Sequence, residues 1–131
     1  MNKTTKYLGL LLLAVFLGSG LSSCEKDPSV AKIFVRSSSN ELVEGAKVIV
    51  IGDVNSNPAT YAWVDTVVTN NSGFAEFNLD AHFEEAAASP GFSEDYTVAY
   101  FDIIVKSGSL TGTGDIRTRI YTTAVETIYL P

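Results

Sequence analysis

Cysteine, histidine and basic residues are scarce in this 131-residue chain. It has one cysteine, one histidine, four prolines and nine lysines or arginines, against 15 aspartates or glutamates. The single cysteine excludes a disulfide framework and a multi-cysteine metal site. The dispersed bases argue against nucleic acid as a partner, because binding to a phosphate backbone requires a clustered positive surface. A hydrophobic content of 46% excludes a disordered or low-complexity chain.

The first 23 residues have the three parts of a secretory signal peptide. A basic, polar stretch over residues 1–7 precedes an uninterrupted apolar run over residues 8–17, and small residues follow before Cys24. A helix of about ten residues spans roughly 15 Å, half the thickness of a hydrocarbon core, so the run is too short for a permanent membrane span. Without this segment the chain keeps seven basic and 15 acidic residues, a net charge of −8.

Residues 21–24 (LSSC) resemble the bacterial lipobox. The resemblance implies cleavage just before Cys24, addition of diacylglycerol to its sulfur and acylation of its amine, which anchors a protein stably. The alternative is an ordinary secretory signal that leaves a free thiol. Residues 24–29 form the lipidated cysteine and a polar tether, and residues 25–27 (EKD) are similar to the start of Bacteroidota lipoproteins. We therefore expect a cell-envelope protein anchored at the outer membrane, on its periplasmic or its surface-exposed face.

Residues 30–131 alternate between apolar and polar side chains, with turn residues at intervals, which is typical of an all-β sandwich. Residues 80–88 are predicted to form one or two helical turns, with Asp80 as the N-cap. Residues 107–114 are predicted to be a flexible loop. The six or seven predicted strands cover residues 30–37, 46–51, 61–69, 74–79 and 95–106, and one or two more lie within residues 115–130, with a break near residues 122–123.

Two segments resemble the carboxypeptidase regulatory-like, or transthyretin-like, sandwich. They are residues 42–50 (LVEGAKVIV) and residues 68–77 (VTNNSGFAEF). The resemblance implies an immunoglobulin-like sandwich in which Gly45 turns the chain into a strand. It also implies that Gly73 closes a hairpin between the third and fourth predicted strands, with Phe77 on the core face. These motifs specify a fold and carry no chemistry.

No pattern in the sequence predicts a catalytic or metal site. A zinc site built on His82, the single histidine, would need three ligands from dispersed acids, so we expect His82 to be partly exposed in the short helix. Residues 53–57 (DVNSN) have the alternating oxygens of a calcium loop. Pro58 and Val64 stand where such a loop needs glycine and glutamate, so an Asx turn is the better interpretation. We expect no enzyme activity and no cofactor.

The third predicted strand carries the candidates for carbohydrate chemistry. Tyr61 and Trp63 fall on one face, where they either stack on a glycan or pack in the core, and core packing is the better interpretation. Residues 65–67 (DTV) resemble the sequon at which Bacteroidota O-glycosylate exported proteins, with Thr66 as the acceptor. The predicted function is a lipid-anchored envelope module that acts in binding or assembly, with an envelope protein or a glycan as partner. The alternative is a surface glycan-binding accessory protein.

Overall fold

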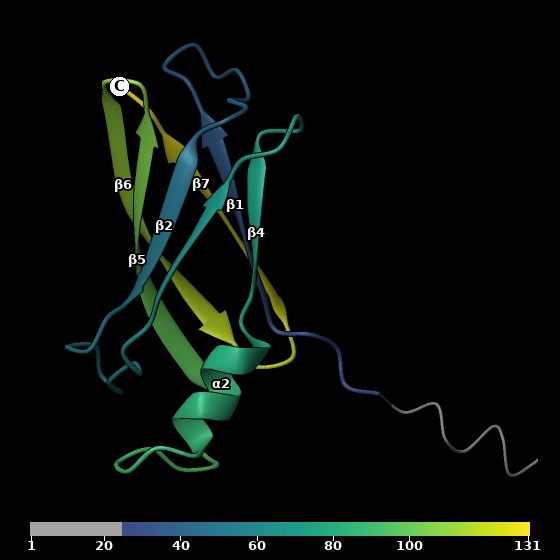
Figure 1. Cartoon of the computed structure of the whole chain (residues 1–131), viewed down its shortest axis with the longest axis vertical. Coiled ribbons are helices and arrows are strands. Elements are labelled where there is room, and N and C mark those ends of the chain that lie inside the picture. Colours follow the sequence, from purple (N-terminus) through teal and green to yellow (C-terminus); the bar gives the residue numbers. More distant parts are fainter. Residues whose placement is uncertain (1–24) are drawn as a thin grey trace, which may run out of the picture.

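The computed structural model describes residues 25–131, which form two facing sheets with a short helix at one end (Figure 1). The predicted signal peptide and the predicted lipidation site at Cys24 lie outside the described residues. The strands are β1 (Val30–Arg36), β2 (Lys47–Gly52), β3 (Val64–Val68), β4 (Phe74–Asn78), β5 (Val98–Ser107), β6 (Leu110–Arg119) and β7 (Thr123–Tyr129), and the helix is α2 (Asp80–Ala87).

The two sheets have three and four strands. The order is β4-β1-β7 in one sheet and β3-β2-β5-β6 in the other. β1 pairs antiparallel with β4 and parallel with β7, while all pairs in the larger sheet are antiparallel. The predicted all-β sandwich with a short helical insertion is therefore confirmed. The C-terminus lies at the end of the sandwich opposite to α2 (Figure 1).

The core lies between the sheets and is built from alternate residues of each strand. In β1, Ala31, Ile33 and Val35 are buried, because successive side chains of a strand point to opposite faces. The largest fully buried rings are Phe77 of β4 and Phe101 of β5. Burying a side chain of this size stabilises the fold by about 1.5–3 kcal/mol. The inward-facing residues of the alternating pattern are therefore the ones that hold the two sheets together.

The predicted hairpin across Gly73 is wrong, because β3 and β4 belong to different sheets. The turn before Gly73 carries the chain from one layer to the other, and the N–H of Gly73 donates to the carbonyl of Asn70 at 2.9 Å. Gly73 has a φ of +75°, the left-handed conformation that a glycine at this turn allows. A strand alternates between apolar and polar residues whether it pairs with the preceding strand or lies in the opposite sheet. The sequence pattern therefore did not show that β4 lies in the other sheet from β3.

The predicted flexible loop over residues 107–114 is mostly strand. β5 and β6 are joined by a tight turn at Gly108, and Gly112 lies buried within β6. A Cβ at Gly112 would lie only 2.9 Å from the carbonyl oxygen of Tyr129 in β7. Because Gly112 and Gly114 have no side chains, β7 approaches β6 closely at that edge of the sandwich. The small residues that suggested a loop serve strand packing instead.

Candidate functional site

Helix α2 covers one end of the sandwich and places His82 at the centre of an aromatic cluster. The exposed fraction of His82 is 0%, so the predicted partial exposure is wrong. α2 presents His82, Phe83 and Ala86 to the interior, and five ring centroids lie 5.0 to 5.8 Å from the imidazole. The members of the aromatic cluster are Tyr61, Trp63, His82, Phe83, Phe92, Tyr96 and Phe101.

The hydroxyl of Tyr96 joins His82 to the backbone before β3. It lies 2.8 Å from Nε2 of His82 and accepts a hydrogen bond from the N–H of Tyr61 at 2.9 Å. Burial lowers the pKa of His82 to about 4 and raises the pKa of Tyr96, so both groups are neutral at pH 7. An imidazole that is fully buried does not reach a molecule in solution. His82 therefore organises the end of the sandwich rather than contacting a ligand.

Tyr61 and Trp63 both turn into the aromatic cluster. They lie in an extended segment before β3 rather than within a strand. Nε1 of Trp63 is buried and the ring packs against the core, while Tyr61 meets Phe92 edge-on with centroids 5.5 Å apart. The structure therefore brings together the two residues proposed for glycan stacking, and the core-packing interpretation accounts for Trp63. Glycan stacking itself stays a prediction.

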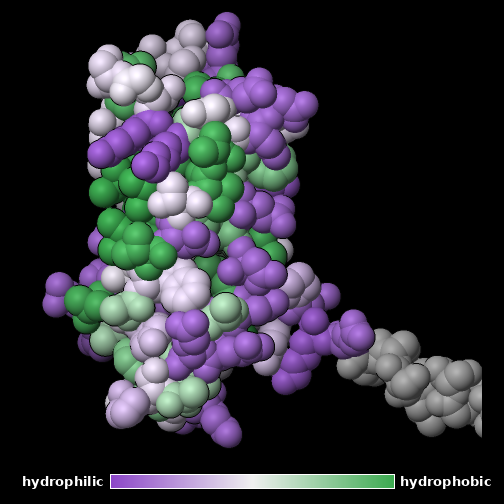
Figure 2. Space-filling view, in the orientation of Figure 1, coloured by the Kyte–Doolittle hydropathy of each residue, from purple (hydrophilic) through white to green (hydrophobic). Residues whose placement is uncertain are grey.

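The predicted O-glycosylation residue lies on the edge strand β3. Thr66 is exposed, as are the neighbouring outward residues Val64 and Val68, which have exposed fractions of 66% and 57%. Figure 2 shows apolar side chains, in green, among polar ones on the face that is turned to the viewer. Oδ1 of Asp65 accepts a hydrogen bond from the N–H of Thr66 at 2.8 Å, which occupies one backbone donor of the edge strand. Modification of Thr66 stays a prediction.

The Asx turn predicted at Asp53 is present. Oδ1 of Asp53 accepts a hydrogen bond from the N–H of Asn55 at 3.0 Å, which folds the loop locally. Within residues 25–131, no group of three or more histidine, cysteine, aspartate or glutamate side chains is placed to hold a metal ion. In the same part of the chain, no helix is long and apolar enough to cross a membrane.

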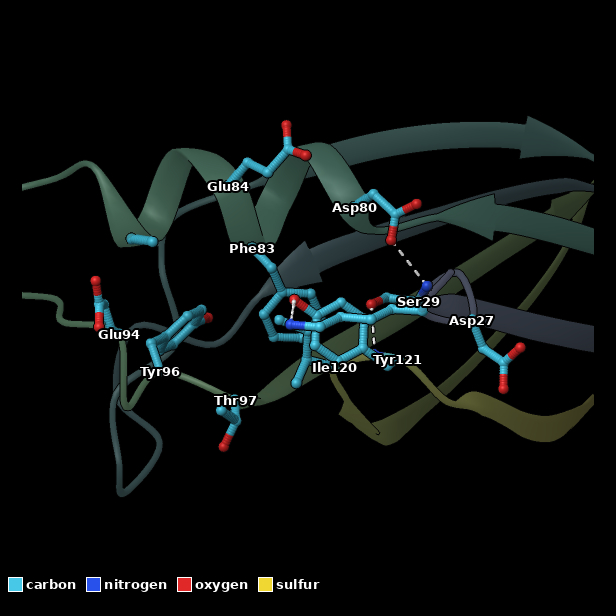
Figure 3. Close-up of a pocket in the computed structure, with 12 residues that line it drawn as sticks. Asp27, Ser29, Asp80, Phe83, Glu84, Glu94, Tyr96, Thr97, Ile120 and Tyr121 are labelled. Carbon is cyan, nitrogen blue, oxygen red and sulfur yellow. Dashed lines mark hydrogen bonds between the residues drawn. The ribbon is translucent and has the colours of Figure 1, made fainter. Parts of the chain in front are cut away.

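A cavity of about 530 Å³, the end cavity, opens between the tether, α2, the segment before β5 and the turn that joins β6 to β7 (Figure 3). Apolar side chains lie at its centre and carboxylates lie around them (Figure 3). Phe83 and Tyr96 belong both to this lining and to the aromatic cluster, so the cluster supports the cavity from behind. The lining residues are Lys26, Asp27, Ser29, Asp80, Phe83, Glu84, Ala87, Glu94, Tyr96, Thr97, Ile120 and Tyr121.

Ser29 connects three of the four segments that border the end cavity, namely the tether, α2 and the β6–β7 turn. Its N–H donates to Oδ1 of Asp80 at 2.8 Å, and its Oγ accepts from the N–H of Tyr121 at 2.8 Å. Its carbonyl accepts from the N–H of Leu79 at 2.8 Å. Asp80 was predicted to cap α2, but Leu79 occupies the N-cap position and the helix has no side-chain cap. The prediction is wrong because the Asp80 carboxylate is used by a donor 51 residues away.

Tyr121 stands at the mouth of the end cavity in an unusual backbone conformation. Its φ is +60°, which is uncommon for a residue other than glycine, asparagine or aspartate. The side chain is 42% exposed. The ammonium of Lys26 lies 4.7 Å from the centroid of the Tyr121 ring and donates to its hydroxyl at 3.4 Å. A cation of the tether therefore already occupies one face of this ring.

The sequence did not predict the end cavity, although Asp80 and residues 25–27 carried predictions of other kinds. Ser29 and Tyr121, which meet there, are 92 positions apart. Their meeting depends on the parallel pairing of β1 with β7, for which no local pattern exists. The one available signal was the helical stretch at residues 80–88, which interrupts an otherwise all-β pattern.

No family model and no curated protein matches this chain. Among solved structures, it is similar to the Bacillus anthracis TIE protein, with 14% identity and a TM-score of 0.49 over 79% of this chain and 16% of that one. It is also similar to catechol 1,2-dioxygenase from Acinetobacter sp. ADP1, with 8% identity and a TM-score of 0.48 over 83% and 54% of the two chains. It is similar as well to 3-chlorocatechol 1,2-dioxygenase from Rhodococcus opacus 1CP, with 8% identity and a TM-score of 0.47 over 82% of this chain and 61% of that one.

This chain thus spans less than two thirds of the length of each of these proteins. The expectation of no enzyme activity is corrected by the comparison. The catechol 1,2-dioxygenases among these structures are enzymes, and their TM-scores of 0.47 to 0.49 give this chain no activity of its own. At this identity the likeness concerns the fold alone and gives no residue of this chain a role.

Proposed function

We propose that the protein is a lipid-anchored β-sandwich module of the cell envelope that binds a partner molecule at its α2 end. The N-terminal signal pattern and the lipobox-like residues 21–24 support the anchor at Cys24. The acidic start of the tether supports a lipoprotein of the Bacteroidota type at the outer membrane. Partner binding is assigned to the α2 end because the end cavity opens there.

The assignment to the carboxypeptidase regulatory-like, or transthyretin-like, sandwich is part of this proposal. Gly45 and Gly73 have φ angles of +78° and +75°, which suits the turn positions that the resemblance gives them. Phe77 lies in the core, as the resemblance implies. The hairpin that it also implies is not formed, so the support comes from these positions and not from the pairing of β3 with β4.

The observation that carries the proposal is the shortness of the tether, because only four residues separate Cys24 from Ser29 in the sequence. Residues 25–28 are exposed, whereas Ser29 is 1% exposed and hydrogen-bonded to Asp80 and Tyr121. Residues 25–28 together span at most about 14 Å when fully extended. An anchor at Cys24 would therefore hold the α2 end and its cavity close to the membrane, where a membrane-bound or membrane-adjacent partner is within reach.

The anchor is tested by replacing its cysteine. Wild-type protein from a lipidating host should enter the detergent phase on phase separation, and its mass should include the acyl groups. Cys24→Ala should move to the aqueous phase and lose that mass, while a surface control, Ser39→Ala, should behave as wild type. If Cys24→Ala stays in the detergent phase with the mass of the wild type, the lipoprotein proposal is wrong.

A further inference from the structure

We propose that the end cavity binds a lysine side chain presented by a segment of a partner protein. The cavity has the size of a ligand site, since such sites have volumes of about 300–1,000 Å³. Its lining includes Phe83, Ile120 and the ring of Tyr121, which lie toward the centre of the view in Figure 3. This surface suits the four-carbon stem of a lysine, which packs on apolar groups while its ammonium stays near water.

The charges around the end cavity select a cation. The lining includes Asp27, Asp80, Glu84 and Glu94, against Lys26 as the single base among the lining residues. Asp80 already accepts a hydrogen bond from Ser29, whereas the other three carboxylates belong to exposed residues. The negative electrostatic potential of these carboxylates adds to that of the whole chain, which has a net charge of −6. Anionic headgroups and phosphates are disfavoured here, and an ammonium is favoured.

The tether itself shows that the cavity mouth accommodates an ammonium. Nζ of Lys26 lies 4.7 Å from the centroid of the Tyr121 ring, within the range of a cation–π contact, and 3.4 Å from the hydroxyl. The hydrogen bond from Tyr121 N–H to Ser29 holds the backbone that carries this ring. A lysine from a partner would compete with Lys26 for Tyr121, so the tether acts as an internal occupant of part of the site.

The expected source of the ammonium is a protein segment and not a free amine. Exposed ion pairs contribute little to binding, because water and salt screen them. A small amine also loses its translational and rotational freedom on binding, which a few exposed contacts do not offset. A peptide adds contacts along the open mouth of the cavity. The inference rests on the proposed function only for the place where the partner is found, since binding in solution does not require the anchor.

The test uses fluorescence anisotropy of labelled peptides with the full-length chain in detergent. The probe is fluorescein-Gly-Leu-Lys-Leu-Gly, and the matched probe carries methionine in place of lysine. We expect the lysine probe to bind at least fivefold more tightly at 50 mM salt, and the difference to shrink at 500 mM salt. n-Butylamine should displace the lysine probe only at concentrations far above that of the unlabelled peptide.

Two triple variants with the same net charge separate the cavity from the general field. Asp27→Asn with Glu84→Gln and Glu94→Gln removes the cavity carboxylates and should weaken binding of the lysine probe at least fivefold. The control removes three exposed acids that do not line the cavity, Glu41→Gln with Glu76→Gln and Glu85→Gln, and should leave most of the affinity. Lys26→Met removes the internal cation and should strengthen binding about twofold or more.

Several results would overturn the inference. These are equal binding of the lysine and methionine probes, an equal loss in the two triple variants, and a failure of the lysine probe to saturate the wild-type chain. Equal affinity for n-butylamine and the peptide would assign the cavity to free amines. Repeating the titration with Cys24→Ala separates the two proposals, because loss of the anchor with unchanged peptide binding affects the membrane assignment alone.

Discussion

The hydroxyl of Tyr96 lies 2.8 Å from Nε2 of His82, and this contact joins the helix at the end of the sandwich to the segment that leads into β5. The same hydroxyl accepts the N–H of Tyr61, so one oxygen satisfies groups from two different segments. Tyr96 also lines the end cavity, and the ring of His82 packs against Tyr96 from the interior side. The stability of this end of the domain therefore depends on a small number of buried polar atoms.

Tyr96→Phe should destabilise the fold by about 1–3 kcal/mol. The substitution keeps the ring but leaves the N–H of Tyr61 and Nε2 of His82 without their partner, and such buried groups are costly when unsatisfied. Urea unfolding monitored by tryptophan fluorescence measures the change. Tyr129→Phe is the control, because Tyr129 is 60% exposed and its change should stay within about 0.5 kcal/mol. Equal effects of the two substitutions would contradict the role of the buried hydroxyl.

Acidification should destabilise the protein through His82. Its folded-state pKa is about 4, below the ordinary value of 6.5, because burial disfavours the charged imidazole. Between these values the unfolded chain binds a proton that the folded chain does not. This difference in proton binding therefore has no effect on stability above pH 6.5. As the pH falls towards 4, it lowers the free energy of unfolding by up to about 1.4 kcal/mol per pH unit.

Carboxylates also titrate at low pH, so the measurement is a comparison with His82→Gln. Urea unfolding of both proteins between pH 7.5 and 4 should show that the stability advantage of the wild type shrinks as the pH falls. Above pH 7 the advantage should be constant. An advantage that does not change between pH 7 and pH 5 would show that the burial of His82 leaves its proton affinity unperturbed.

Gly73→Ala should cost more than Gly45→Ala, although the two glycines have nearly the same φ, +75° and +78°. Both substitutions place a side chain in a left-handed conformation, at a cost of about 1–2 kcal/mol. At Gly73 the new Cβ would also lie 2.7 Å from Cβ of Leu42, whereas at Gly45 nothing lies within 4 Å. We expect an additional cost of about 1 kcal/mol or more at Gly73. Equal melting temperatures of the two variants would remove the packing argument at this turn.

Trp63→Ala should lower the free energy of unfolding by about 3 kcal/mol, because the ring packs against the core and against His82. Trp63→Phe should retain much of that stability. The glycan hypothesis makes the opposite prediction, a stable variant that has lost binding to a polysaccharide. Thermal unfolding together with native gels cast with polysaccharides distinguishes the two, and a fully stable Trp63→Ala with altered migration would favour glycan binding.

The sequence by itself determined which residues face the core and where most elements lie. The alternation within residues 30–37 places Ile33 and Val35 on the same face of one strand, and both are buried in β1. Side-chain direction in a strand depends only on local backbone geometry, so a period of two is readable without any knowledge of neighbours. The short helix was identified from local composition, since alanines and end signals are also readable without knowledge of neighbours, and α2 covers residues 80 to 87.

The tertiary structure alone decided which segments meet. β3 and β4 follow each other in the chain yet belong to different sheets, and β1 pairs with β7 from the far end of the chain. Alternation records whether a residue faces inward or outward and says nothing about the partner strand. The burial of His82 and the meeting of Ser29 with Tyr121 follow from that pairing, because only the assembled layers bring α2, the tether and the β6–β7 turn to one end of the sandwich.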